Sequence, residues 1–290
     1  MMPRSFRVWT LALALLVGPS AAQAQFPATR LYTLFPSGGQ VGQTTEVTVT
    51  GGDDLEELDA LLFSHPGITA TPKLNDQKQP INQVFLVTVA ADVPPGLYEA
   101  YTRGLWGVSN PRRFVIGTRP QVNEVEPNNT PDKPQAATLN QAIFGRMDGG
   151  TDVDWYSFVA QKGQRIVFDC MSARIDSRME PVLEILDPTG RRRLAQAKLA
   201  GAADPLLVFD VPVDGEYRLR IHDVTYRNGG EYFYRLDIHA GPQVLFAWPD
   251  RAHASPMIAV SVARDFGSWW RDRSMGSTNA RASSVSPRMR

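Results

Sequence analysis

Side chains with oxygen ligand atoms gather at the two ends of the segment 124–158. The first group lies within a short proline-containing stretch and consists of Glu124, Glu126, Asn128 and Asn129. The second group, Asp152 and Asp154, comes directly before a run of aromatic residues. Calcium in proteins takes about six to eight oxygen ligands from carboxylates, amides and backbone carbonyls. The segment therefore predicts a calcium site at which a linker meets the entrance of a β-strand.

Residue spacing supports this prediction in part. In an extended chain, a spacing of two places Glu124, Glu126 and Asn128 on one side, and Asp152 shares a face with Asp154. Carboxylates brought together without a cation would repel each other. The alternative is that these acids are only solvated, as acids in linkers and turns usually are. The glycines at 149 and 150 leave the register of Asp152 open, and Asp148 is its alternative.

No catalytic motif accompanies these acids. The sequence contains neither a His-Glu-x-x-His zinc motif nor a Gly-x-Ser-x-Gly nucleophile turn, and no nucleotide-binding glycine loop. His222 and His239 lie on the polar sides of two alternating strands, where we expect a solvated pair. We therefore expect no enzyme activity. The alternative is a calcium-dependent secreted hydrolase, which would need paired acids in a pocket.

The N-terminus has the features of a secretory signal peptide, for which we expect residues 1–24. Arg4 and Arg7 precede an apolar run at 8–17, and cleavage is expected after Ala24. No later segment has the roughly 18 apolar residues of a membrane span. We therefore expect a protein that is secreted, periplasmic or on the cell surface, without a transmembrane segment.

Charge and cysteine content narrow the partners further. Lys+Arg and Asp+Glu each total 30, so no excess of positive charge favours nucleic acid as a partner. The single cysteine, Cys170, excludes an intrachain disulfide, and its alternating apolar neighbours favour a buried side chain over a reactive thiol.

The remaining pattern is typical of an all-β protein. With 22 Pro and 23 Gly, turns are frequent, and apolar residues alternate over segments such as 45–50, 217–222 and 232–239. We expect two β-sandwich domains, at 26–118 and 119–240, with the glycines at 229 and 230 in the turn between the last two strands. Residues 241–290 are rich in Arg, Ser and Met. They are expected to be irregular or disordered, or the product of a truncation or a reading-frame change.

The first predicted sandwich resembles immunoglobulin-like domains of the IPT/TIG type. This likeness rests on Pro36, on glycines at 38, 39 and 42, and on the segment 46–51. Residues 124–239 resemble the bacterial pre-peptidase C-terminal domain. The matching features are Glu126-Pro127-Asn128-Asn129, Asp152-x-Asp154-Trp155-Tyr156-x-Phe158, Gly163-Gln164, Leu186-Asp187-Pro188-x-Gly190 and Asp214-Gly215-Glu216-Tyr217.

The second resemblance implies a jelly-roll-like sandwich that accompanies secreted peptidases and other large extracellular proteins. It also implies calcium as a bound ion between linker and sandwich, with six matching positions. These are Glu124, Glu126, Asn128, Asn129, Asp152 and Asp154. We accordingly expect a monomeric binding or spacer module of an extracellular protein, whose partner is an extracellular polymer or protein. An accessory domain of a peptidase is the alternative. Exposed side chains suited to such a partner are Tyr226, Phe233, Arg218, Arg220 and Arg235.

Overall fold

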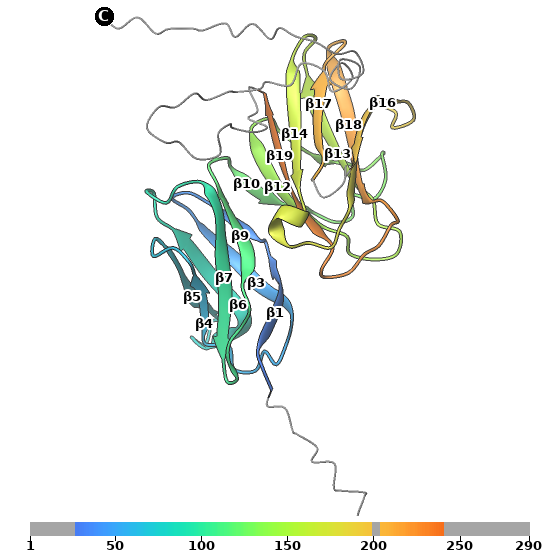
Figure 1. Ribbon diagram of the computed structural model, residues 1–290. Coiled ribbons are helices and arrows are strands. Elements are labelled where there is room, and N and C mark those ends of the chain that lie inside the picture. Colours follow the sequence, from blue (N-terminus) through green and yellow to red (C-terminus); the bar gives the residue numbers. More distant parts are fainter. Residues whose placement is uncertain (1–26, 199–203, 241–290) are drawn as a thin grey trace, which may run out of the picture.

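The structure, a computed structural model, describes residues 27–198 and 204–240 (Figure 1). The predicted signal peptide and the predicted C-terminal tail lie outside these residues. The described residues form strands and one short 3-10 turn, η1 (Ala173–Ile175), so the all-β prediction is confirmed. Within them, no helix has the length and hydropathy of a membrane span.

Two sheets form the N-terminal part. The first sheet has the order β1-β3-β6-β5, with β1 (Arg30–Phe35), β3 (Thr44–Asp53), β6 (Pro80–Val89) and β5 (Ile68–Leu74). The second has the order β2-β9-β7-β4, with β2 (Gly38–Gln40), β9 (Arg112–Gly117), β7 (Gly96–Gly104) and β4 (Ala60–Phe63). A short strand, β8 (Gly107–Val108), pairs with β7. Apolar side chains from both sheets pack between them, among them Leu31, Val47, Phe85, Val87 and Phe114.

Two further sheets form the C-terminal part. One has the order β10-β12-β19-β14-β17, with β10 (Gln121–Asn123), β12 (Gln141–Arg146), β19 (Phe233–Ala240), β14 (Arg165–Met171) and β17 (Leu206–Asp210). The other has the order β11-β13-β18-β15-β16, with β11 (Gln135–Ala136), β13 (Asp154–Ala160), β18 (Gly215–Asp223), β15 (Pro181–Leu186) and β16 (Arg193–Lys198).

Alternation along the strands decides which side chains enter the core between these two sheets. In β13, Tyr156 and Phe158 are buried, whereas Val159, on the opposite face of the strand, is 72% exposed. In β18, Leu219 and Ile221 point into the same core. This is the period of two that a strand with one buried face requires.

The two pairs of sheets touch through a small apolar contact (Figure 1). Its buried members are Val115, Phe144, Ile175 and Phe233. Gly38 of β2 lies so close to β12 that an added Cβ atom would be 2.7 Å from Cζ of Phe144. The linker between β9 and β10 therefore joins sheets that are already packed against each other.

Three details of the predicted binding face and of the last turn are wrong. Phe233 and Arg235 are each 2% exposed, because the N-terminal sheets cover this side of β19. His222 in β18 and His239 in β19 lie in different sheets and are both buried, so they form no solvated pair. The glycine turn before β19 thus crosses between sheets and does not close a hairpin. Tyr226 is exposed as expected, at 42%.

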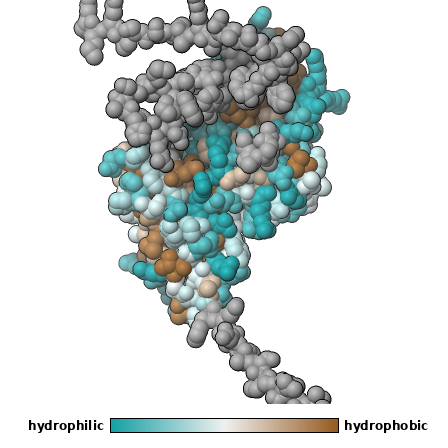
Figure 2. All heavy atoms as spheres, in the orientation of Figure 1, coloured by the Kyte–Doolittle hydropathy of each residue, from teal (hydrophilic) through white to brown (hydrophobic). Residues whose placement is uncertain are grey.

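Most of the described surface in the view of Figure 2 is hydrophilic, with scattered apolar residues. The exposed large apolar residues of the described part include Leu105 and Trp106, at the turn between β7 and β8, and Val108 on β8. Isolated apolar residues are normal on a protein surface and call for no functional explanation.

Candidate metal site

Backbone pairing brings the two ends of the segment 124–158 together. β10 runs parallel to β12, and the linker continues this pairing as the Glu124 N–H donates to the Phe144 carbonyl oxygen at 2.8 Å. Farther along, the Trp155 N–H donates to the carbonyl oxygen of Asn128 at 2.9 Å. The linker is therefore held to β12 at one end and to the start of β13 at the other.

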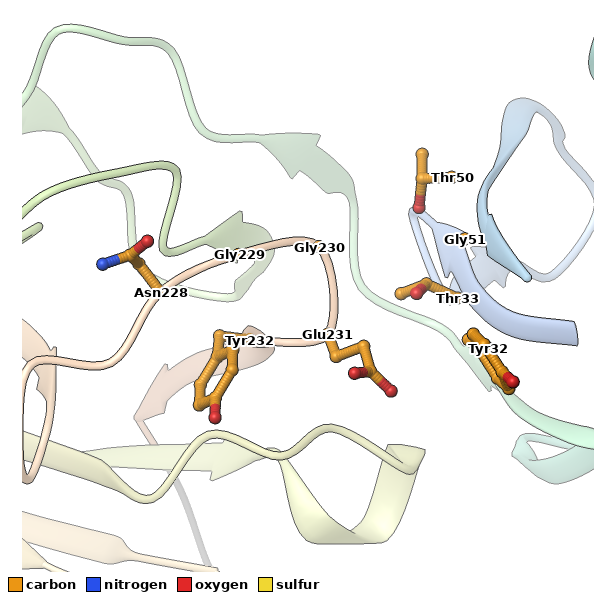
Figure 3. A pocket seen from close by; sticks show the side chains of 9 residues that line it. All are labelled: Tyr32, Thr33, Thr50, Gly51, Asn228, Gly229, Gly230, Glu231 and Tyr232. Carbon is orange, nitrogen blue, oxygen red and sulfur yellow. The ribbon is translucent and has the colours of Figure 1, made fainter. Parts of the chain in front are cut away.

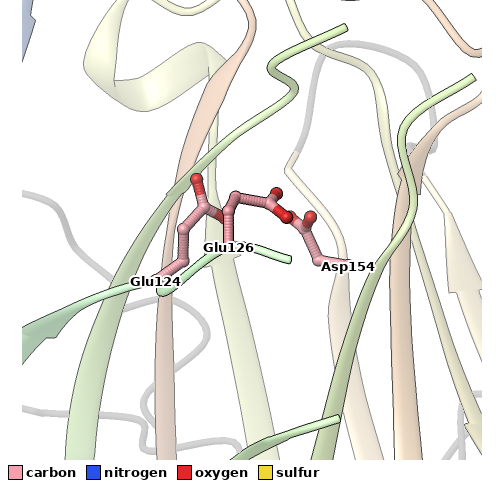
Figure 4. A group of neighbouring side chains, drawn as sticks. All are labelled: Glu124, Glu126 and Asp154. Carbon is pink, nitrogen blue, oxygen red and sulfur yellow. The ribbon is translucent and has the colours of Figure 1, made fainter. Parts of the chain in front are cut away.

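Three carboxylates converge between these two attachments (Figure 4). Glu124, Glu126 and Asp154 each offer an oxygen, and these oxygens lie within 4.8 Å of one another. Asp154 is fully buried, Glu124 is half-buried and Glu126 is exposed. The group therefore closes one end of the sandwich core and faces solvent on the side of Glu126.

Several polar atoms at this place are buried without a hydrogen-bond partner. They are Oε2 of Glu124, Oδ1 of Asp154 and both side-chain atoms of Asn128, a residue that is only 1% exposed. Buried polar atoms in proteins are nearly always hydrogen bonded, and each exception calls for an explanation. A hard cation between the carboxylates would satisfy the unpaired oxygens of Glu124 and Asp154. The residues present thus fit calcium, which prefers an all-oxygen donor set.

Electrostatics disfavours these charges without a cation. Burial raises the pKa of Glu124 and of Asp154, and the charge of Glu124 raises that of Asp154 further. Burial also raises the pKa of Glu126. The carboxyls therefore hold protons more tightly than free carboxyls do, unless a positive ion replaces the protons.

Neighbouring groups fix the orientation of the buried carboxylates. The Tyr234 hydroxyl donates to Oδ2 of Asp154 at 2.6 Å, and the Tyr156 hydroxyl lies 2.6 Å from that of Tyr234. The Arg146 N–H donates to Oε1 of Glu124 at 2.5 Å. In both buried carboxylates one oxygen accepts a hydrogen bond and the other has no donor. Groups that hydrogen bond to metal ligands orient them in this way.

Three of the six expected ligands, Asn128, Asn129 and Asp152, are not among the three convergent carboxylates. Asp152 is buried beside it, but its oxygens accept hydrogen bonds from the backbone N–H groups of Asp148 and Val153, at 2.5 Å and 2.9 Å. Asn129 is exposed, next to the buried Asn128. Asp148 instead pairs with Arg146 at 3.2 Å. Ligation by any of the six residues stays a prediction.

Sequence reasoning missed the two tyrosines and Gly145. An added Cβ atom at Gly145 would lie 2.6 Å from Oε2 of Glu124 and 2.3 Å from the Tyr234 hydroxyl oxygen, so only glycine leaves room here. Tyr156 carries a sequence signal, because it lies two residues after Asp154 and thus on the same face. Tyr234 carries none, since only the register of β12 with β19 places it opposite Gly145.

Comparison with known proteins gives only weak matches to solved structures. No protein family and no curated protein matches the sequence. Among solved structures, the pre-peptidase C-terminal domain of a Bacillus anthracis collagenase is 17% identical. That match covers 42% of this chain and 99% of that chain, with a TM-score of 0.30.

Two further matches have similar values. The g-type lysozyme inhibitor PliG of Aeromonas hydrophila is 15% identical, covering 37% of this chain and 99% of its own at a TM-score of 0.28. SGBP-B from the mixed-linkage glucan utilization locus of Bacteroides ovatus is 9% identical. That match covers 74% of this chain and 76% of that chain, with a TM-score of 0.24. These values assign the chain to no family.

Proposed function

We propose that the protein is a non-catalytic binding or spacer module of an extracellular or cell-surface protein, in which calcium fixes the linker against the C-terminal sandwich. The observation that carries this proposal is the set of buried oxygens without donors on Glu124, Asn128 and Asp154. The expected signal peptide supports a location outside the cytoplasm, where calcium sites of about 10⁻⁴ to 10⁻³ M affinity are common.

The residues that would hold the ion are Glu124, Glu126, Asn128 and Asp154. The ion would supply positive charge and would cross-link the linker to the start of β13. The chain itself supplies the rest: Tyr234 and the Arg146 N–H orient the carboxylates, and the pairing of β10 with β12 brings the linker into place. Since the linker follows β9 directly, the same ion would fix the connection between the two pairs of sheets.

A hydrolase is the weaker candidate. It would need a pocket at the acids in which a substrate bond lies between them. Neither Glu124 nor Asp154 lines either of two clefts in the described part of the chain, which have Tyr32 and Glu231 in their walls. A role as accessory domain of a peptidase remains compatible with the proposed function.

Calcium-dependent stability tests the proposal. Thermal unfolding of the mature protein would be followed in 2 mM calcium and in excess chelator, for the wild type and two variants. Glu126→Gln removes the negative charge of the exposed ligand and leaves the core intact. Asp132→Asn removes an exposed carboxylate of the same segment that lies outside the group, and is the matched control.

We expect calcium to raise the melting temperature of the wild type and of Asp132→Asn. Glu126→Gln should lose most of this response, because the ion loses a charged ligand. Identical melting curves of the wild-type protein in calcium and in chelator would show that the group is not a calcium site.

A further inference from the structure

A cleft lies where β1 and β3 of the first sheet face the loop that leads into β19 (Figure 3). A second cleft adjoins it and shares Tyr32 and Glu231 with it. Their volumes are about 190 Å³ and about 420 Å³. Tyr32 and Glu231 line both clefts, and the Glu231 side chain points toward Tyr32. Ligand sites occur preferentially at such junctions between packed units.

Local sequence explains why this space is open. The register of β1 with β3 shifts on both sides of Thr33, next to Tyr32, so the strand edge is irregular here. Gly51, Gly229 and Gly230 put no side chains into the gap. Gly229 has a φ of +118°, which favours glycine at this turn. The Tyr232 N–H donates to the Gly229 carbonyl oxygen at 2.9 Å and holds the loop in shape.

One polar group in the wall has no partner. Oγ1 of Thr33 is buried and makes no hydrogen bond, and the residue is only 2% exposed. An unpaired buried hydroxyl reduces stability unless another group satisfies it. Thr33 therefore supplies an unused hydrogen-bonding group in the wall of the first cleft.

The other polar groups are already held in place. The Tyr32 hydroxyl donates to Asp53, and Nε of Arg112 donates to the Leu31 carbonyl oxygen at 2.9 Å. Nη1 of Arg178 donates to Oε2 of Glu231 at 2.9 Å. In the second cleft, Arg112 and Arg178 balance the negative charges of Asp176 and Glu231. The cleft thus offers fixed donors and acceptors without an excess of either charge.

This chemistry favours a particular class of ligand. A balanced set of charges gives little attraction for an anion or a cation. Hydroxyl groups that both donate and accept would match the mixed wall, and the ring of Tyr32 adds an amphipathic surface. We propose that the two clefts, whose walls include Tyr32, Thr33 and Glu231, form a binding site for a neutral saccharide segment. This proposal names the ligand of the module proposed above and rests on that function.

Filling the cleft tests the proposal directly. An added Cβ atom at Gly230 would have only the Thr50 carbonyl oxygen within 4 Å, at 4.0 Å, and Gly230 is not in the left-handed region. Gly230→Leu would therefore project into the cleft without strain. The matched control is Gly215→Leu, because Gly215 also avoids the left-handed region and faces open space at the start of β18.

Binding would be measured in calcium by affinity electrophoresis with soluble glucans, xylan, mannan and galactan, and then by calorimetry with the matching oligosaccharides. We expect at least one neutral polysaccharide to retard the wild type and Gly215→Leu. Gly230→Leu should bind at least tenfold more weakly while melting at a similar temperature. If Gly230→Leu does not fold, Glu231→Gln replaces it and should also weaken binding.

The proposal is overturned if none of these polysaccharides retards the wild type. Unchanged retardation of Gly230→Leu would likewise exclude the cleft. The melting experiment separates these failures from failure of the proposed function. If calcium stabilises a protein that binds no saccharide through this cleft, the calcium-fixed module stands and the saccharide site does not.

Discussion

Replacing Asp154 with Asn should change the calcium-free and the calcium-bound protein in opposite directions. Asn has nearly the same shape, and its amide oxygen still accepts the hydrogen bond from the Tyr234 hydroxyl. Without calcium, the substitution removes a carboxyl whose pKa is raised by burial and by the charge of Glu124. With calcium, it removes the most deeply buried charged ligand of the group.

The expected size of the calcium response follows from the unpaired oxygens. Glu124, Asn128 and Asp154 each contribute one such oxygen. Leaving a buried polar group unpaired reduces stability by at least about 1 kcal/mol, so an ion that satisfies all three would contribute about 3 kcal/mol. Mass action gives about 2.7 kcal/mol for an ion at a hundred times its dissociation constant. For a protein of this size, that is a rise in melting temperature of roughly 5–10 °C.

Thermal unfolding at pH 8, in chelator and in calcium, tests both expected changes in the melting temperature of Asp154→Asn. At this pH a deprotonated Asp154 is unfavourable in the calcium-free protein. A carboxyl whose pKa is higher in the folded than in the unfolded state reduces stability as the pH rises toward the folded value. The variant should therefore melt higher than the wild type in chelator and respond little to calcium. A variant that melts lower in chelator and keeps the full calcium response would refute the assignment of Asp154.

Two further predictions concern groups outside the candidate site. Burial opposes ionisation of Asp223, but hydrogen bonds from the side chain and N–H of Arg227 and from the Glu180 N–H outweigh it and lower its pKa to about 2. The ionised Asp223 should therefore stabilise the folded protein above pH 4, and this contribution should be lost as the pH falls toward 2. In urea unfolding, the free energy of unfolding of Asp223→Asn should fall less over this pH range than that of the wild type. Burial raises the pKa of the Cys170 thiol, so a thiol reagent should modify it only in denaturant, as a colorimetric assay would show.

The local sequence pattern was sufficient to predict the class of fold and to single out two of the acids that converge. Alternation identifies β13 and β18 as strands with one buried face because burial repeats with the same period as the side chains. The spacing of Glu124 and Glu126 has the same origin, and the structure places both in the convergent group with Asp154. Each of these inferences depends only on residues close together in the chain.

Properties that depend on distant packing did not follow from pattern. The segments 217–222 and 232–239 alternate as the strands of a hairpin would, yet β18 and β19 belong to different sheets. Asp223 explains part of this difference. Its carboxylate accepts hydrogen bonds from the N–H groups of Thr225 and Arg227, which turns the chain away from β18. The side of β19 with Phe233 and Arg235 also looked solvent-facing, since alternation does not reveal that another pair of sheets covers it.

In the candidate metal site, too, some features follow from the local sequence and others depend on the pairing of distant strands. Its acidic members come from two short segments, and their types alone indicate calcium. What makes Asp154 suitable as a ligand is the hydrogen bond from Tyr234, which engages Oδ2 and leaves Oδ1 without a donor. Tyr234 reaches Asp154 only because β12 pairs with β19 in the register that sets Gly145 opposite it. A shift of that register by one residue would point Tyr234 to the other face of the sheet and leave both oxygens of Asp154 unoriented. The register of these two strands is therefore part of the site as much as its carboxylates are.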